Sequence, residues 1–438
     1  MSGVAQRIAA RDSQYATSRL SRATRIAEPQ DNDFTSGALT VRGPIGKLEA
    51  QATTAYVDQE FGSTYDASIL ASSLGVASPV AYIEDRSARL LSQEVRLSDP
   101  TARHPWIIGA TILHSTSLLK GRFTSVGDDT IDARRDEGRT SRTSPCSPRV
   151  RSASQARSIS SSGCGPSRRR AILSSRHLAA FAPTASVLPP SGTLSWHRDD
   201  LGLVWLRYAS AVRPAGISRT ADPTNLRIPG DELQSLELGW RIRAAGDRLA
   251  LHGAVFGSAW QHLRSDTVGP DGLLGTVDAG NAVNYGLELG GVLNLSPITI
   301  DFGATLQRAR LTSPSSNTGL DRDDRRLPVV PDISSRLTAS RTLVAFGSPA
   351  SVYGVARYTG RTRLSFDPLL DRPAGNYATI DAGATIDRGP WHWSIAVDNL
   401  LDSRGNSFGF GNPFTLATST QTVPIRPRTI TLRATIGL

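Results

Sequence analysis

Along much of the chain, apolar side chains alternate with polar or small side chains at every second position. In residues 235–243, for example, Leu236, Leu238, Trp240 and Ile242 alternate with serine, glutamate, glycine and two arginines. The same alternation fills residues 283–290, 298–307, 391–398 and 429–438. A period of two is typical of a strand with one apolar face. The pattern therefore predicts an all-β, antiparallel architecture.

The predicted strands are long and come in pairs. Residues 231–243 and 248–264 exceed the usual strand of about five or six residues and reach the roughly 9–11 that cross a bilayer at a tilt. Tight turns at residues 245–247, 296–297 and 387–389 join the pairs, and longer polar connections at residues 266–281, 313–326 and 402–424 separate them. Short turns on one side and long loops on the other are typical of outer-membrane barrels. Alternation alone also fits a soluble sandwich, but strand length and loop asymmetry favour a transmembrane β-barrel, here a partial one.

The N-terminal part continues this style. Residues 39–42 and 48–56 flank a predicted hairpin turn at residues 43–46, and residues 89–97 pair with residues 106–114 across residues 98–104. Residues 1–37 show no core-forming periodicity and contain no apolar secretory segment, so no signal peptide is visible. We therefore divide the chain into an irregular segment (1–37), early barrel strands (38–124), a low-complexity segment (125–190) and a C-terminal barrel region (191–438).

The low-complexity segment departs from the alternation. Residues 133–176 hold eleven arginines and only two acidic residues, Asp136 and Glu137, so they account for +9 of the formal net charge of +10. Both cysteines, Cys146 and Cys164, lie there, and serine and arginine fill about half of the segment. Three interpretations remain open: a disordered surface loop, an Arg/Ser-rich nucleic-acid-binding arm, or residues translated out of the ancestral frame, with that frame restored near residues 189–194. We expect a disordered insert and no nucleic-acid partner.

Several short strings occur in an order that resembles one family. They are Ser92-Gln93-Glu94-Val95-Arg96-Leu97-Ser98, Leu206-Arg207-Tyr208-Ala209-Ser210 with Arg213-Pro214-Ala215-Gly216, Glu237-Leu238-Gly239, Tyr285-Gly286-Leu287-Glu288, Val397-Asp398-Asn399-Leu400-Leu401-Asp402 and Pro427-Arg428-Thr429-Ile430. Each string alone is ordinary strand-end chemistry, because Asn and Asp side chains cap loops and proline can open a strand. Together, over about 350 residues, they resemble the C-terminal barrel of TonB-dependent outer-membrane receptors.

The resemblance implies a Gram-negative outer-membrane location and an ancestral role in the uptake of ferric siderophores or similar large nutrients. The family's other partners would be membrane lipid and the energy-transducing TonB complex. Residues 1–37 resemble neither the family's plug domain nor its TonB box, and the chain ends in Leu438 where the family usually ends in an aromatic residue. We therefore expect a truncated or degenerate relative. The alternatives are a non-gated, porin-like barrel and a basic soluble RNA-binding protein.

No pattern of residues predicts catalysis, a cofactor or a metal centre, so we expect no enzyme. The seven histidines are scattered (His104, His114, His177, His197, His252, His262 and His392). Cys146 and Cys164 have no second cysteine pair or nearby histidine to complete a zinc site. The acidic run at residues 321–324 contains an arginine, which favours a solvated loop tip over a calcium site. Trp391 and Trp393 suit an aromatic girdle at the bilayer interface.

Overall fold

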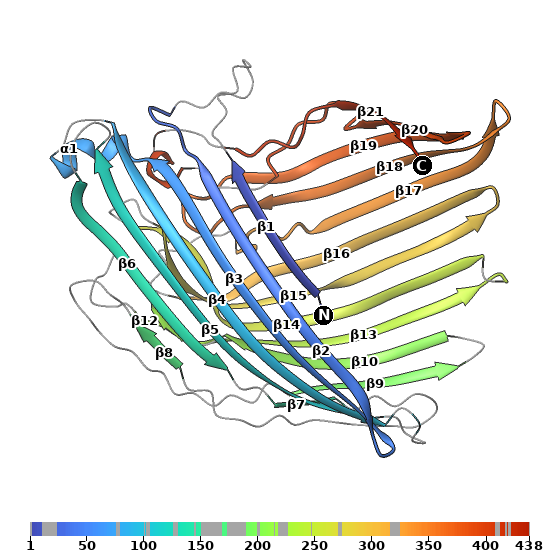
Figure 1. Cartoon of the computed structure of the whole chain (residues 1–438), viewed down its shortest axis with the longest axis horizontal. Helices are drawn as coiled ribbons and strands as arrows, with labels where there is room; N and C mark the ends of the chain where they lie inside the picture. Colours follow the sequence, from blue (N-terminus) through green and yellow to red (C-terminus); the bar gives the residue numbers. More distant parts are fainter. Residues whose placement is uncertain are drawn as a thin grey trace.

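The computed structural model describes residues 2–10, 24–75, 79–99, 101, 106–125, 130–143, 146–149, 169–172, 190–198, 202–213, 215–217, 227–246, 248–269, 274–315, 325–407, 412–416, 418 and 422–437. Almost all of this is antiparallel β structure in two large sheets. Figure 1 shows them as two curved layers, the first (blue to teal) in front of the second (green to red), with strands that cross at an angle. Among the described residues, no helix is long and apolar enough to cross a membrane.

The first sheet has the strand order β1-β2-β3-β4-β5-β6-β8, with β7 paired to β5. Its strands are β1 (Ser2–Ala10), β2 (Gln30–Ile45), β3 (Leu48–Asp66), β4 (Val80–Asp99), β5 (Trp106–Ser125), β6 (Thr130–Thr143), β7 (Cys146–Arg149) and β8 (Arg169–Ile172). A 3-10 turn η1 (Ser68–Leu70) and a short helix α1 (Ala71–Leu74) lie between β3 and β4.

The second sheet has the order β21-β20-β19-β18-β17-β16-β15-β14-β13-β10-β9, and β11 pairs with β12 separately. Its strands are β9 (Ser191–Arg198), β10 (Gly202–Arg213), β13 (Asp231–Ala244), β14 (Leu249–Val268), β15 (Leu274–Leu295), β16 (Ile298–Pro314), β17 (Ile333–Ala345), β18 (Ser348–Arg363), β19 (Pro373–Arg388), β20 (Trp391–Asp398) and β21 (Thr429–Ile436). The small strands are β11 (Gly216–Ile217) and β12 (Arg227–Ile228), and a 3-10 turn η3 (Pro413–Thr415) precedes β21.

The two ends of the strands differ, as the sequence predicts. At one end, turns of two residues join β2 to β3, β15 to β16 and β19 to β20, while the connections at the other end are longer, up to the 30 residues between β20 and β21. In Figure 1 the short turns lie toward the right and the long connections toward the left. We call these the short-turn end and the loop end. Short turns face the periplasm and long loops the exterior in outer-membrane barrels.

The two faces of the strands also differ as predicted. Leu236 and Leu238 are 52% and 48% exposed on one face of β13, and Leu432 is 77% exposed on β21. The cross-strand register places Glu237 on the opposite face, opposite Arg207 of β10. Apolar side chains that stay exposed along one face of such strands are those that a lipid bilayer would cover. We call this apolar face the outer face and the polar one the inner face.

Buried apolar clusters among the described residues lie at the loop end. One joins Val80, Tyr82 and Phe123 of the first sheet to Phe414, which precedes β21. The other contains Leu263, Leu311 and Phe366, with four further residues (Ala279, Ala282, Ala309 and Leu327). The alternating apolar residues of the strands do not meet each other in a dry core, which a soluble sandwich would require.

Two expectations from the sequence differ from the structure. Residues 1–37, expected to be irregular, contain β1 and the first part of β2, which pair with one another from Ser2 to Ala10. The low-complexity segment, expected to be disordered, contains β6, which pairs with β5 between Leu113 and Thr124. Backbone ladders hold these strands, and such pairing needs no alternation of side chains, so the hydrophobic pattern gave no signal for them. The three interpretations of residues 133–176 and the proposed domain boundaries stay predictions.

Candidate ligand-binding end of the barrel

The inner face of the second sheet is a polar wall. The Trp205 indole donates to Glu237 Oε1 at 2.7 Å, and Arg357 pairs with Asp381 across β18 and β19. Neighbouring glycines leave room for large inner-face side chains to lie flat, because a Cβ at Gly239 would meet the Trp205 ring and one at Gly383 would meet the Tyr353 ring. The wall therefore presents hydrogen-bonding groups while its aromatic rings are folded against the sheet.

Where β10 and β13 reach the loop end, the wall carries a buried carboxylate. Arg213 Nε donates to both oxygens of Asp231, at 2.9 and 3.0 Å, and the Trp260 indole donates to Asp231 at 3.2 Å. Asp231 is only 2% exposed. Burial alone would raise its pKa, but the hydrogen bond and charge of Arg213, with smaller contributions from Arg264 and Trp260, lower the pKa below its usual value. This carboxylate is therefore ionised and already occupied by its partners.

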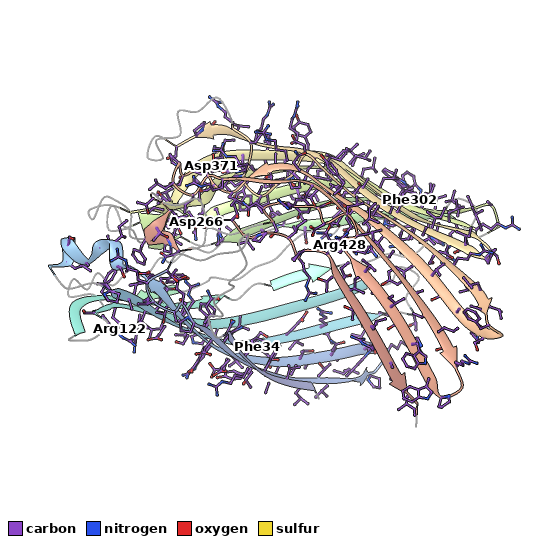
Figure 2. All side chains as sticks on the ribbon, turned by 90° about the horizontal axis from the view of Figure 1, so that it is seen from above. Phe34, Arg122, Asp266, Phe302, Asp371 and Arg428 are labelled. Carbon is purple, nitrogen blue, oxygen red and sulfur yellow. The ribbon has the colours of Figure 1, made fainter. Side chains whose placement is uncertain are left out.

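A second carboxylate at this end has a different environment. Asp266 lies near the end of β14 and pairs in register with Thr276 of β15. Its side chain keeps solvent contact, yet the surrounding protein removes enough hydration to raise its pKa. Figure 2 shows Asp266 and Asp371 toward the same end of the molecule as Arg122 of the first sheet, away from Phe302.

The connection between β18 and β19 folds back over this end. Asp367 Oδ2 accepts hydrogen bonds from the Thr267 hydroxyl at 2.7 Å and from the Val268 amide at 3.0 Å. Arg363, which is 7% exposed, donates to Asp371 Oδ2 at 2.6 Å. These contacts hold the loop against the end of β14. The loop end of the sheet is therefore an ordered surface.

One exposed arginine of this inner face lies at the loop end. Arg361 lies between Arg357 and Arg363 on the same face of β18, opposite Gly375 of β19. Its neighbours are held in ion pairs with Asp381 and Asp371, whereas Arg361 is exposed and forms no ion pair with any residue that the structure describes. Together with Asp266 it offers an accessible positive and an accessible negative group beside the loops.

A buried side-chain contact joins the first sheet to the loop before β21. Asn412 Nδ2 donates to Glu28 Oε1 at 2.6 Å and to the Asp66 carbonyl at 2.7 Å. The Phe414 ring lies 5.4 Å from the Tyr82 ring and 5.8 Å from the Phe123 ring. Hydrogen bonds from Ser68 and from the backbone of Arg25 outweigh burial and lower the pKa of Asp66. We call Glu28, Asp66, Asn412 and Phe414 the latch.

The candidate residues of the sequence are dispersed. His252 lies on the inner face over Gly290, His262 Nδ1 is 2.9 Å from Asp278 in a β-bulge, and His392 Nδ1 is 2.6 Å from Asp387 at the short-turn end. His114 is in β5, His197 in β9 and Cys146 in β7, whereas His104, Cys164, His177 and residues 321–324 lie outside the described residues. Within the described ranges, no three His, Cys, Asp or Glu side chains gather as a metal site would require.

The predicted turn residues and tryptophans are placed as follows. The turn between β2 and β3 was predicted at residues 43–46, but β2 continues to Ile45 and the turn is formed by Gly46 and Lys47. Trp391 and Trp393 stack at 5.6 Å on the outer face near the short-turn end. The sequence analysis did not identify Arg361, Asp266 or the latch, because each depends on contacts between distant segments. For Arg361, the one signal in the sequence was the run of arginines with no acidic residue along residues 357–363.

Solved structures of similar shape share one function class. The chain is similar to the ferric yersiniabactin uptake receptor FyuA from Yersinia pestis (TM-score 0.72, 15% identity, 94% of this chain and 62% of that chain). It is also similar to the siderophore receptor PiuA from Acinetobacter baumannii (0.65, 14%, 94% and 64%) and to the iron transporter FrpB from Neisseria meningitidis (0.63, 12%, 99% and 69%). The chain thus spans less than two thirds of the length of FyuA and PiuA. At these identities the likeness shows the fold alone.

The sequence comparisons give the family. A search of curated proteins found no match. The sequence profile of the family described as "TonB dependent receptor-like, beta-barrel" matches residues 170–400, which is more than half of the 438 residues. The match includes the inner-face wall, Asp231, Asp266, Arg361 and the β18–β19 connection. The chain belongs to the TonB-dependent receptor-like β-barrel family.

Proposed function

We propose that this chain forms the barrel of a Gram-negative outer-membrane receptor that takes up a ferric siderophore or a similar large metal-carrying nutrient. The observation that carries the proposal is the loop end of the inner face. There, exposed Arg361 stands above a wall of hydrogen-bonding side chains, and exposed Asp266 lies at the same end of the strands beside a fixed loop. Ferric chelates with anionic oxygen donors would be attracted by a guanidinium that no carboxylate of the described residues neutralises.

The names of the structural neighbours support this ligand class. FyuA is described as a ferric yersiniabactin uptake receptor, BauA from Acinetobacter baumannii as a ferric preacinetobactin receptor and OprC as a copper transporter. Metal acquisition is the property that these descriptions share. For this chain we propose the same class of cargo, with the TonB complex as the energy-transducing partner of the whole protein. That the chain is a truncated or degenerate form stays a prediction.

Two measurements test the proposal. The expressed chain is fractionated and floated on a density gradient, where we expect it with the outer membrane. The purified protein in detergent is then titrated with a ferric catecholate and a ferric hydroxamate, following tryptophan fluorescence.

Replacement of Arg361 by glutamine should weaken binding of the anionic catecholate complex by at least about ten-fold, since a charge-assisted contact contributes roughly 1.5–3 kcal/mol. Arg388→Gln removes the same charge at the short-turn end and should leave binding unchanged. A chain that stays soluble would argue against the receptor. Equal affinity of the Arg361→Gln variant and the parent chain would argue against a ligand site at the loop end. Passage of small solutes with no ligand binding would favour the non-gated barrel instead.

A further inference from the structure

The outer face of the second sheet carries a groove at the short-turn end. It spans β17–β21, has a volume of about 570 Å³ and is lined mainly by apolar side chains, including Leu343, Val352, Ile386, Trp393, Ile395 and Leu432. The cross-strand register puts these six residues on one face, because Val352 pairs with Ala384, Ile386 with Trp393 and Ile395 with Leu432. This is the face opposite to that of Arg357, Arg361 and Asp381, so the groove lies outside the barrel.

The groove is as large as a ligand pocket, and the side chains that line it are exposed. Cavities that hold small molecules range over roughly 300–1,000 Å³. Leu432 is 77% exposed, Trp393 is 50% exposed, and Phe346 at the β17–β18 turn is 91% exposed. Within the described residues, no side chain covers this surface from another element.

Two arginines border the groove on the same face. Arg341 pairs with groove-lining Val352 on one side and with Ile298, the first residue after the Ser296–Pro297 turn, on the other. Arg388 ends β19 and pairs with Trp391, whose ring stacks on groove-lining Trp393. Arg388 is therefore at the short-turn edge of the sheet, and Arg341 is level with the short-turn end of β16, although β17 itself continues to Ala345. Both are exposed, and neither forms an ion pair with the described part of the chain.

This arrangement matches the chemistry of one lipid class. Acyl chains are apolar, and basic side chains at a membrane surface attract anionic headgroups. Stacked tryptophans belong at the level where chain and headgroup meet. The inner-face arginines Arg213, Arg357 and Arg363 are held by carboxylates. Arg341 and Arg388, in contrast, are exposed on the outer face beside the groove, where lipid can reach their charge.

We propose that this groove is a binding site for an anionic phospholipid of the periplasmic leaflet. Its acyl chain lies along Val352, Ile386, Trp393 and Leu432, and its phosphate is bound by Arg341 and Arg388. The placement of the lipid in a membrane rests on the proposed outer-membrane location, whereas its binding in detergent does not.

Native mass spectrometry of the full chain in detergent, titrated with phosphatidylglycerol or phosphatidylethanolamine, tests the proposal. We expect phosphatidylglycerol to bind in preference to phosphatidylethanolamine. The variant Arg341→Gln/Arg388→Gln should lower phosphatidylglycerol binding by about ten-fold or more, since each basic residue near an anionic lipid surface contributes about 1 kcal/mol. Ala384→Phe, which fills the groove floor, should reduce binding of both lipids.

Arg308→Gln/Arg310→Gln is the matched control. These residues are exposed on the outer face of β16 toward the loop end, so the variant removes two equal charges and should leave phosphatidylglycerol binding unchanged. Equal losses in both double variants, no preference between the two lipids, or a tightly bound polypeptide in place of lipid would overturn the proposal.

The lipid measurement is separate from the test of outer-membrane function. A chain that binds phosphatidylglycerol through Arg341 and Arg388 in detergent but fails to float with the outer membrane would overturn the proposed receptor and keep the groove. A chain that floats with the outer membrane but binds phosphatidylglycerol equally well without these arginines would support the proposed location and overturn the lipid site.

Discussion

The charged side chains at the loop end and on the inner face fall into two groups: within the described part of the protein, some form ion pairs and others do not. Asp231, Asp371 and Asp381 each hold an arginine, and a carboxylate in such a pair serves the fold. Arg361 and Asp266 are accessible and hold no such partner among the described residues. This contrast separates groups that stabilise the loop end from groups that are free to meet a ligand.

The pair of Asp231 and Arg213 gives a prediction about stability. Asp231→Ala removes the bonds from Arg213 and Trp260 at a site 2% exposed, and should cost about 2 kcal/mol. The measurement is the temperature at which the folded band converts to the unfolded band on SDS gels. Because the folded-state pKa of Asp231 is lowered, the pair stabilises the native protein at neutral pH. That stability is lost as the pH falls below the usual value of 3.8 and through the lowered folded-state pKa.

Asp387→Ala is the control for this variant. The Asp387–His392 pair has side-chain exposures of 57% and 48%, and exposed pairs contribute at most about 1 kcal/mol. Equal losses of stability in the two variants would contradict the importance of the buried site.

Asp266 should respond to pH in the opposite sense. Partial loss of hydration raises its pKa above the usual 3.8, so the native state favours the neutral acid and loses stability as the pH rises through the folded-state pKa. Asp266→Asn should therefore melt at a higher temperature than the parent at pH 7, with no difference below about pH 3.8. Asp367→Asn weakens the bonds to Thr267 and Val268 and should destabilise at pH 7. A stabilisation of the Asp266 variant that does not depend on pH would contradict this account.

At the scale of strands and turns, the sequence predicted those features of the strands that follow from spanning a bilayer. The faces of β13, the turn at Ser296-Pro297 and the asymmetry of the two ends all follow from alternation and loop length. The loop end was predicted less well. A loop was expected over residues 266–281, but β14 continues to Val268 and β15 begins at Leu274. Beyond the bilayer a strand needs only its backbone ladder, so alternation fades while the strand continues.

Backbone geometry at the loop end gives a prediction on the scale of a hairpin. Gly375, near the start of β19, has φ +71°, and a Cβ there would lie 2.0 Å from the Gly360 carbonyl oxygen. Gly375→Ala should therefore cost about 3 kcal/mol or more, because backbone strain and a clash with backbone act together. Gly389→Ala, with φ +60° and open space around the new methyl, should cost only about 1 kcal/mol. The measurement is the melting temperature of each variant in detergent. Equal shifts would show that the Gly360 carbonyl moves aside at little cost.

For the molecule as a whole, the relation of the two sheets depends on the latch. Among the described strands, none of the first sheet is hydrogen-bonded to one of the second. The latch instead joins them through Asn412, whose partner Glu28 is 384 positions away in the chain. No local pattern could have predicted that contact. The same loop reaches the second sheet, since Arg372 donates to the Leu416 carbonyl at 3.1 Å, so the loop before β21 connects both sheets at the mouth.

Asn412→Asp tests whether the latch holds the first sheet in place. The substitution replaces the amide that donates to Glu28 and to the Asp66 carbonyl with a second carboxylate beside Glu28. The loss should be about 2 kcal/mol, which corresponds to roughly 30-fold faster hydrogen exchange where local opening limits it. We expect that acceleration at the amides of Asp66 and Ala67, which bond to Glu28 and Val80, and no change in β13 and β14. Asn406→Asp, at a half-buried position in the same connection that bonds to the Pro373 carbonyl instead, should leave those amides unchanged. Acceleration spread evenly over both sheets would show instead that the two sheets open as one unit, and that the latch is only one contact among many.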